Sequence, residues 1–197
     1  MITLERFRQL EAALRQRGYG ASIDWTEAIV APEDADDFAE RTIYVICNSG
    51  MANTVAAVIY GRCLNALRGG ETATSVFMHP GKASAIDRIW IEREQLFAQY
   101  LESADPLATL QALPWIGEVT ALHLAKNLGA DVAKPDVHME RLARAESTTT
   151  AELCERLSQA TGYRAATIDT ILWRACADRI LLSAVYEAEG WDPAFRP

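Results

Sequence analysis

Two features between residues 105 and 142 carry chemical information: a tight turn and a single carboxylate after it. The turn reads LPWIGEVTA at residues 113–121, where Pro114 ends one helix and Gly117 supplies the unusual backbone angles of a sharp bend. Two helices packed across such a turn leave backbone N–H groups free at a helix start, and these groups suit a DNA phosphate. The carboxylate belongs to Asp136, which opens the next expected helix, and a helix N-terminus stabilises negative charge.

Local signals place the helices on either side of the turn. Asp105 is a typical cap residue and Pro106 suits the first helical position, so a helix is expected between Pro106 and the turn. Apolar residues at helical spacing after Gly117 predict a second helix that stops at Gly129. The hairpin is therefore expected near residues 106–129.

This arrangement resembles the helix-hairpin-helix DNA glycosylase superfamily, which includes endonuclease III and the adenine-mismatch and alkyladenine glycosylases. The positions that carry the resemblance are Leu113, Pro114, Ile116, Gly117, Thr120 and Ala121, followed by Asp136, Arg141 and Leu142. The resemblance implies that Asp136 is the catalytic aspartate. It also implies that the hairpin contacts DNA through these residues: Trp115, Gly117, Val119 and Thr120.

Two hairpin positions depart from the family pattern. Bifunctional members place a lysine two residues after the second hairpin glycine, where this chain has Val119. The resemblance therefore implies a monofunctional enzyme. Trp115 stands where the family usually has glycine, and its bulkier ring opposes a close approach of the backbone to DNA.

Two further positions resemble functional positions of the family. A long apolar helical stretch over residues 43–67 is interrupted at 47–50, and Asn48 matches the residue that fills the duplex when a nucleotide swings out. Alternatively, Asn48 is only part of a kink or helix cap. At residues 81–83 the pattern Gly-Lys-Ala resembles the start of the helix before the hairpin, where Lys82 either contacts phosphate or is inert.

The sequence predicts an all-α fold, because no alternation typical of β-strands reaches a useful length. The resemblance implies two helical lobes with a substrate pocket between them, in a single glycosylase-like unit over residues 1–197. The central lobe is expected over roughly 42–145, and the remaining lobe over 1–40 and 146–197. Individual helices are expected over residues 4–17, 82–101, 149–162 and 164–189, the third starting with a capping box.

Composition narrows the class of protein. A chain of 197 residues with 50% hydrophobic and 23% charged residues is ordinary for a globular protein, and no apolar run reaches the length of a membrane helix. The net charge of −8 argues against tight, unspecific coating of DNA. A local basic face near the hairpin would still permit docking, or is only a solvated face; its residues are Lys126, Lys134, Arg141 and Arg144. We expect a monomer in the cytoplasm, associated with the nucleoid, whose partner is double-stranded DNA containing an altered base.

No cofactor is expected. The cysteines are widely separated and do not form the four-cysteine signature of the iron–sulfur glycosylases; they are Cys47, Cys63, Cys154 and Cys176. The three histidines lack ligand spacing with them, so no zinc is expected either. A monovalent cation at the hairpin is the one ion that stays open as an alternative.

Three functions fit these observations. A monofunctional DNA glycosylase explains the hairpin, Asp136, Val119 and the helical pattern together. A non-catalytic DNA- or protein-binding module is favoured by Trp115 and by the acidic charge. A phage-type enzyme of the same fold that processes modified pyrimidines is the third. In the first, Asp136 is the candidate that stabilises positive charge on the sugar and orients or deprotonates a water.

Overall fold

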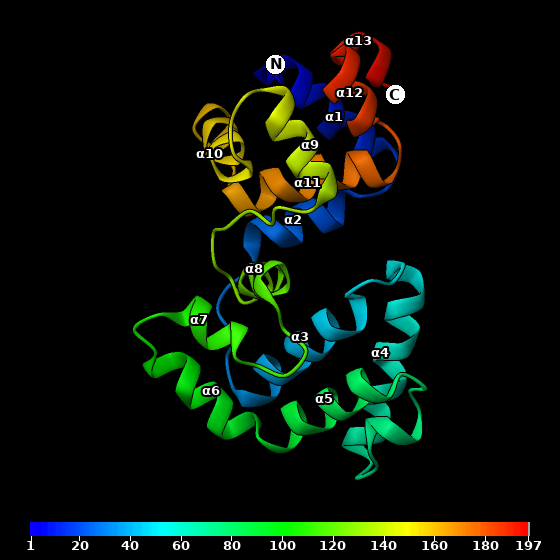
Figure 1. Ribbon diagram of the computed structural model, residues 1–197, viewed down its shortest axis with the longest axis vertical. Helices are drawn as coiled ribbons and strands as arrows, with labels where there is room; N and C mark the ends of the chain where they lie inside the picture. The colour runs from blue at the N-terminus through cyan, green and yellow to red at the C-terminus, as the bar shows by residue number, and fades with distance from the viewer. Residues whose placement is uncertain (197) are drawn as a thin grey trace. The chain divides into compact units, whose positions relative to one another are not determined.

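The protein is all-helical, as the sequence predicts. The computed structural model describes residues 1–196, which form thirteen α-helices, one short 3-10 helix and no β-strand (Figure 1). The chain divides into two compact units, which we call unit 1 (Met1–Ile29 and Ala130–Pro197) and unit 2 (Val30–Gly129). The units change over at residues 29/30 and 129/130, whereas the expected lobes changed over near residues 41 and 145.

Unit 1 is built around one central helix, α11 (Ala165–Ala177). The other helices of this unit are α1 (Leu4–Gln16), α2 (Gly20–Ala28), α9 (Val137–Ala145), α10 (Thr150–Thr161), α12 (Ser183–Glu189) and α13 (Trp191–Ala194). α11 contacts α1, α2, α9 and α10, and nine of its thirteen residues are buried. The buried residues of α11 therefore belong to the core of unit 1.

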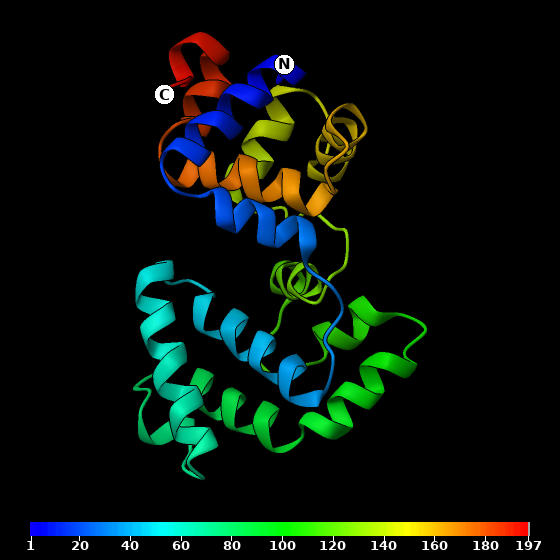
Figure 2. The same cartoon turned by 180° about the vertical axis from the view of Figure 1, so that it is seen from behind.

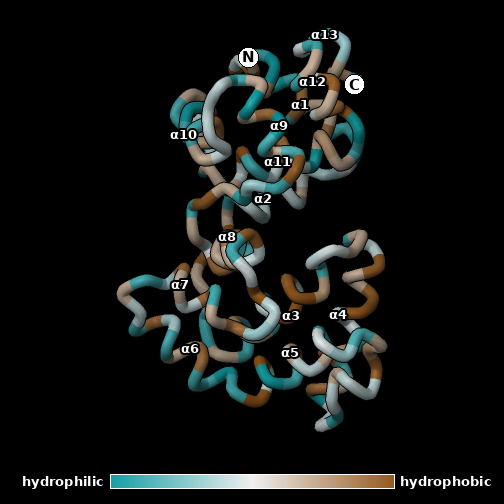
Figure 3. The backbone as a smooth tube through the Cα atoms, viewed as in Figure 1, coloured by the Kyte–Doolittle hydropathy of each residue, from teal (hydrophilic) through white to brown (hydrophobic). Residues whose placement is uncertain are grey.

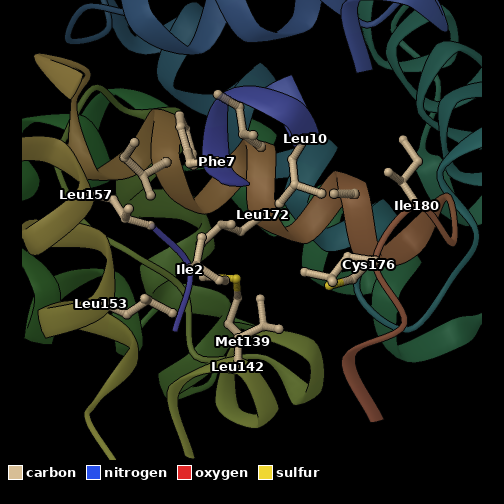
Figure 4. Packing of buried hydrophobic residues seen from close by; sticks show 14 of the residues in the cluster. Ile2, Phe7, Leu10, Met139, Leu142, Leu153, Leu157, Leu172, Cys176 and Ile180 are labelled. Atoms are coloured by element: carbon tan, nitrogen blue, oxygen red, sulfur yellow. The ribbon is translucent and has the colours of Figure 1, made fainter. Parts of the chain in front are cut away.

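The core of unit 1 joins residues from both ends of the chain. Figure 4 shows Phe7 and Leu10 of α1 packed with Leu172 of α11, while Met139 and Leu142 approach from α9. All five side chains are fully buried. Burying each of them contributes about 1.5–3 kcal/mol, so the first helix and the residues after 130 form one cooperative body.

Unit 2 is built around α3 (Ala35–Asn48), which contacts four neighbouring helices (Figure 2). These neighbours are α4 (Asn53–Arg68), α5 (Pro80–Ile91), α6 (Arg93–Glu102) and α8 (Glu118–Asn127). The 3-10 helix η1 (Ala73–Ser75) and α7 (Pro106–Gln111) complete the unit. Hydrophobic and hydrophilic residues alternate along several helices of unit 2 (Figure 3), as expected for helices that pack one side on a core.

Most predicted helix ends are confirmed by their caps. The capping box at Thr149 and Glu152 is formed, and Gly162 ends α10 in the left-handed conformation. Gly129 follows α8 with φ +90°, and a Cβ on it would lie 2.7 Å from the carbonyl carbon of Val30. Only glycine fits that position without strain.

Two long helices predicted from the sequence are each divided. The helix expected over 82–101 is broken at Glu92, which separates α5 from α6. The helix expected over 164–189 ends at Ala177, because Arg179 adopts a left-handed φ of +59° and the chain turns before α12 begins. Among residues 1–196 no helix combines the length and apolar character needed to cross a bilayer.

Candidate functional site

Asp136 is the N-cap of α9. Its backbone is extended, with φ −88° and ψ 176°, and Oδ1 accepts hydrogen bonds from the backbone N–H groups of His138 (3.0 Å) and Met139 (3.1 Å). The side chain is 17% exposed. Because Oδ1 accepts both hydrogen bonds from the helix, the orientation of the carboxylate is fixed, and Oδ2 takes no part in the cap.

A cation and a thiol lie near this carboxylate. Lys134 Nζ is 3.9 Å from Asp136 Oδ2, so the free oxygen has one positive neighbour. Cys176 of α11 lies close enough that, in addition to burial, the negative charge of Asp136 raises the pKa of its thiol to about 12. The thiol is therefore neutral near pH 7.

His138 and Ser183 form a pair that the sequence does not reveal. His138 Nδ1 and Ser183 Oγ are 2.9 Å apart, and the serine is buried. The pair joins the first turn of α9 to the start of α12, and Asp136 caps that same turn. Because 45 residues separate the two side chains, no local spacing in the sequence indicates their contact.

The hairpin in unit 2 has the expected two helices, but the unusual backbone conformation falls on a different residue. Gly117 has φ −96° and ψ −178°, an extended conformation open to any residue, so the role predicted for it in bending the chain was wrong. Trp115 instead has φ +67°. The left-handed residue of this turn is therefore tryptophan, which carries a Cβ, and not glycine.

The start of α8 is open. Gly117 caps it without a side-chain hydrogen bond, and a Cβ built on Gly117 meets no atom within 4 Å. Val119 is 43% exposed in the first turn, and Thr120 is half-buried. Backbone N–H groups at this end therefore have no side chain of their own helix capping them.

The indole ring of Trp115 lies against the start of α5. Its Cζ3 atom would be 2.5 Å from a Cβ on Gly81, so the ring occupies the space that any other residue would need there. The ring also packs edge-on against His79, with centroids 5.1 Å apart. His79 in turn caps α5 by accepting the N–H of Lys82 on Nδ1. The tryptophan is still 45% exposed.

Lys82 does not have the exposed position that contact with phosphate needs. It is 3% exposed, and its ammonium group donates to the carbonyl oxygens of Cys47 and Ser49 at the end of α3. Burial lowers its pKa. The lysine acts here as a C-terminal cap of α3, where the helix dipole favours a positive charge.

Asn48 is the last residue of α3. Its Nδ2 donates to the carbonyl of Tyr44 at 3.0 Å, which is a hydrogen bond within its own helix. This is the geometry of the kink or cap alternative. Entry into a duplex would require that bond to break, and that role stays a prediction.

Unit 2 thus gathers several of the predicted residues around the start of α5. Trp115 packs on Gly81, and Lys82 binds the two carbonyls that flank Asn48. Gly117, Val119 and Thr120 follow the same turn at the start of α8. Asp136 belongs to unit 1.

The basic residues expected to form a docking face are largely neutralised. Arg144 pairs with Glu187 (2.8 Å) and Glu140 (3.8 Å), and Arg141 lies 3.9 Å from the same Glu187. Their charges are balanced within α9 and α12, which weakens the attraction that they can offer to DNA.

No group of three or more His, Cys, Asp or Glu side chains within residues 1–196 is arranged to hold a metal ion. All four cysteines are buried, and none of them forms a disulfide with another described residue. Comparison with family models, curated proteins and solved structures gives no significant match to this chain.

Proposed function

We propose that this protein is a monofunctional DNA glycosylase, which hydrolyses the bond between a sugar and a damaged, mismatched or modified base. The observation that carries the proposal is the state of Asp136: one oxygen is fixed by two N–H groups of α9, and the other is left beside Lys134. Asp136 and the hairpin are also the two features on which the resemblance to the glycosylase superfamily rests.

The carboxylate suits the transition state of this reaction. Cleavage of an N-glycosidic bond leaves positive charge on the sugar, and a fixed carboxylate stabilises that charge without reorganising. Oδ2 is the atom available to face the sugar or to accept a proton from the attacking water. The His138–Ser183 pair supports this role, because it holds the helix turn that Asp136 caps.

The hairpin supports DNA binding. Gly117 leaves the start of α8 bare, so a phosphate can approach the backbone N–H groups there. Val119, and no amine, follows in the first turn, which favours simple hydrolysis over formation of a Schiff base with the sugar.

A non-catalytic binding module is the second candidate, and three features in and near the hairpin favour it. Glu118 places a negative charge in the first turn of α8, where it repels phosphate. The ring of Trp115 is half-exposed beside the turn, and Lys82 is engaged with carbonyl oxygens. A surface of this kind also suits a protein partner.

Release of free base separates these candidates. The assay uses duplexes with damaged, mismatched or modified bases, including modified pyrimidines, which tests the third alternative as well. On a duplex from which the protein releases base, Asp136→Asn should abolish release and leave DNA affinity within a few-fold, since asparagine also caps a helix and only the charge is lost.

Asp34→Asn is the matched control, because Asp34 is likewise an aspartate N-cap, of α3. It should release base at the wild-type rate. Wild-type release by Asp136→Asn would show that Asp136 is only a cap. Borohydride should trap no adduct between the wild-type protein and DNA. An adduct that forms with the wild-type protein but not with Lys134→Ala would show that Lys134 attacks the sugar, and the enzyme would then be a lyase.

A further inference from the structure

One arginine of unit 1 has no acidic partner. The guanidinium of Arg174 on α11 lies over two aromatic rings, with Cζ 4.6 Å from the ring centroid of Trp173 and 4.8 Å from that of Tyr19. Its Nε is buried and has no hydrogen-bond partner. Within residues 1–196 the guanidinium forms these two ring contacts and no ion pair.

This position differs from that of other arginines in the same unit. Arg15 pairs with Glu11 and Asp24, and Arg156 pairs with Glu146. A partly buried cation without a counter-charge is costly, because it loses hydration and gains only its contacts with the rings. The planar face of Arg174 is used by the rings, whereas its N–H groups point along the plane and stay available as donors.

A second arginine stands beside it. Hydrogen bonding with Asp178 raises the pKa of Tyr19, while the positive charges of Arg174 and Arg17 act in the opposite direction, so both guanidiniums lie near the tyrosine hydroxyl. Arg17 Nη1 donates to the backbone carbonyl of Asp178 at 3.1 Å. Asp178 is the C-cap of α11, so Arg17 reaches the end of the helix that carries Arg174.

We propose that Arg174, with Arg17 beside it, forms an anion site that takes a backbone phosphate of the DNA. This inference rests on the proposed function, because DNA is the partner named there. A guanidinium held by ring stacking is pre-organised, and its in-plane donors match the oxygens of a phosphate. In a chain of net charge −8, whose Arg141, Arg144 and Lys82 are engaged, this pair is a cation cluster still open to a polyanion.

The test measures the affinity for a fluorescein-labelled duplex containing a tetrahydrofuran abasic analogue, by anisotropy over a range of NaCl concentrations. Arg174→Gln should weaken binding about tenfold, since a hydrogen bond to a charged group is lost. The slope of log affinity against log salt should fall by about 0.9, as expected for one phosphate contact. Arg174→Lys should keep the slope, because the charge stays, and lose part of the affinity with the planar donors.

Arg6→Gln is the matched control. Arg6 also lies in unit 1 over an aromatic ring, Trp191, but its Nη1 donates to the carbonyl of Met1 at 2.7 Å. The substitution removes the same charge and the same kind of ring contact, and it should leave affinity and slope unchanged. Helical circular dichroism of all variants checks the fold. Where Arg174→Gln unfolds, the loss of affinity by Arg174→Lys reports on the site, and wild-type affinity of Arg174→Lys would overturn the proposal.

Three outcomes overturn the proposal in distinguishable ways. If the wild-type protein binds the duplex and Arg174→Gln keeps its slope, the phosphate contact is absent while the proposed function stands. If the wild-type protein does not bind duplex DNA, the proposed function fails first. If inorganic phosphate shifts the NMR resonance of Arg174 Nε–Hε but Arg174→Gln binds DNA with wild-type affinity, the site takes free phosphate and not a DNA phosphate.

Discussion

At the scale of single residues, Trp115 combines two opposing contributions. A left-handed conformation costs a residue with a Cβ roughly 1–2 kcal/mol. The indole ring offsets part of that cost through its contacts with Gly81 and His79. Trp115 and Gly81 therefore depend on each other: the ring needs a residue without Cβ beneath it.

This dependence predicts a strong coupling between the two positions. Gly81→Ala should lower the free energy of unfolding in the wild-type background, since the new Cβ would meet the indole at 2.5 Å. In a Trp115→Gly background the same substitution should raise it by about 0.4–1 kcal/mol, because the unfolded chain loses freedom and nothing clashes. Urea denaturation of the four proteins measures the cycle. Additive effects would mean that the ring swings away freely.

At the scale of elements, the open start of α8 makes Gly117→Val a clean test of the hairpin. The backbone there is extended and the space around Gly117 is empty, so valine should fold normally. It would nevertheless stand where a phosphate approaches the N–H groups. We expect duplex affinity to fall for all sequences while helical circular dichroism and the unfolding midpoint stay unchanged.

Gly61→Val is the control for this substitution, since Gly61 of α4 also has open space around it. It should leave duplex affinity at the wild-type value. If Gly117→Val binds DNA normally, DNA docks elsewhere on the molecule.

The elements also show what the sequence could predict. Caps are local, so Asp136, Thr149 and Gly162 fall where the residue types indicated. Packing is not local. The contact of Ser183 with His138 depends on residues brought together by folding. Residue type also did not show which turn residue is left-handed. Glycine favours that conformation, so Gly117 was expected to adopt it, but Trp115 adopts it instead.

Lys82 illustrates the same limit on predicting a site. A lysine at a helix start is usually exposed, which made a phosphate contact a reasonable expectation. Only the fold places its ammonium group against the end of α3, where two carbonyls bind it. The sequence therefore singled out residues 81–83, but it did not show that the charge of Lys82 caps α3.

At the scale of the whole molecule, the hairpin and the candidate catalytic aspartate belong to different compact units. Unit 1 has its own core around α11, and unit 2 has its own around α3. The residues that Asp136 contacts, His138, Met139 and Lys134, all lie in unit 1, while Gly117 lies in unit 2. Binding through the hairpin and chemistry at the aspartate are therefore expected to vary independently.

The variant that carries both Asp136→Asn and Gly117→Val tests this independence. Substitutions that share no contacts add within about 0.3–0.5 kcal/mol, which is roughly a twofold change in Kd. Gly117→Val should thus weaken duplex binding by the same factor in the wild-type and in the Asp136→Asn background, as measured by fluorescence anisotropy at one salt concentration. Base release by Gly117→Val alone should recover at saturating protein, because the carboxylate is intact. A factor that differs severalfold between the backgrounds would show that the aspartate itself contributes to DNA binding, and the division into a binding hairpin and a chemical carboxylate would have to be abandoned.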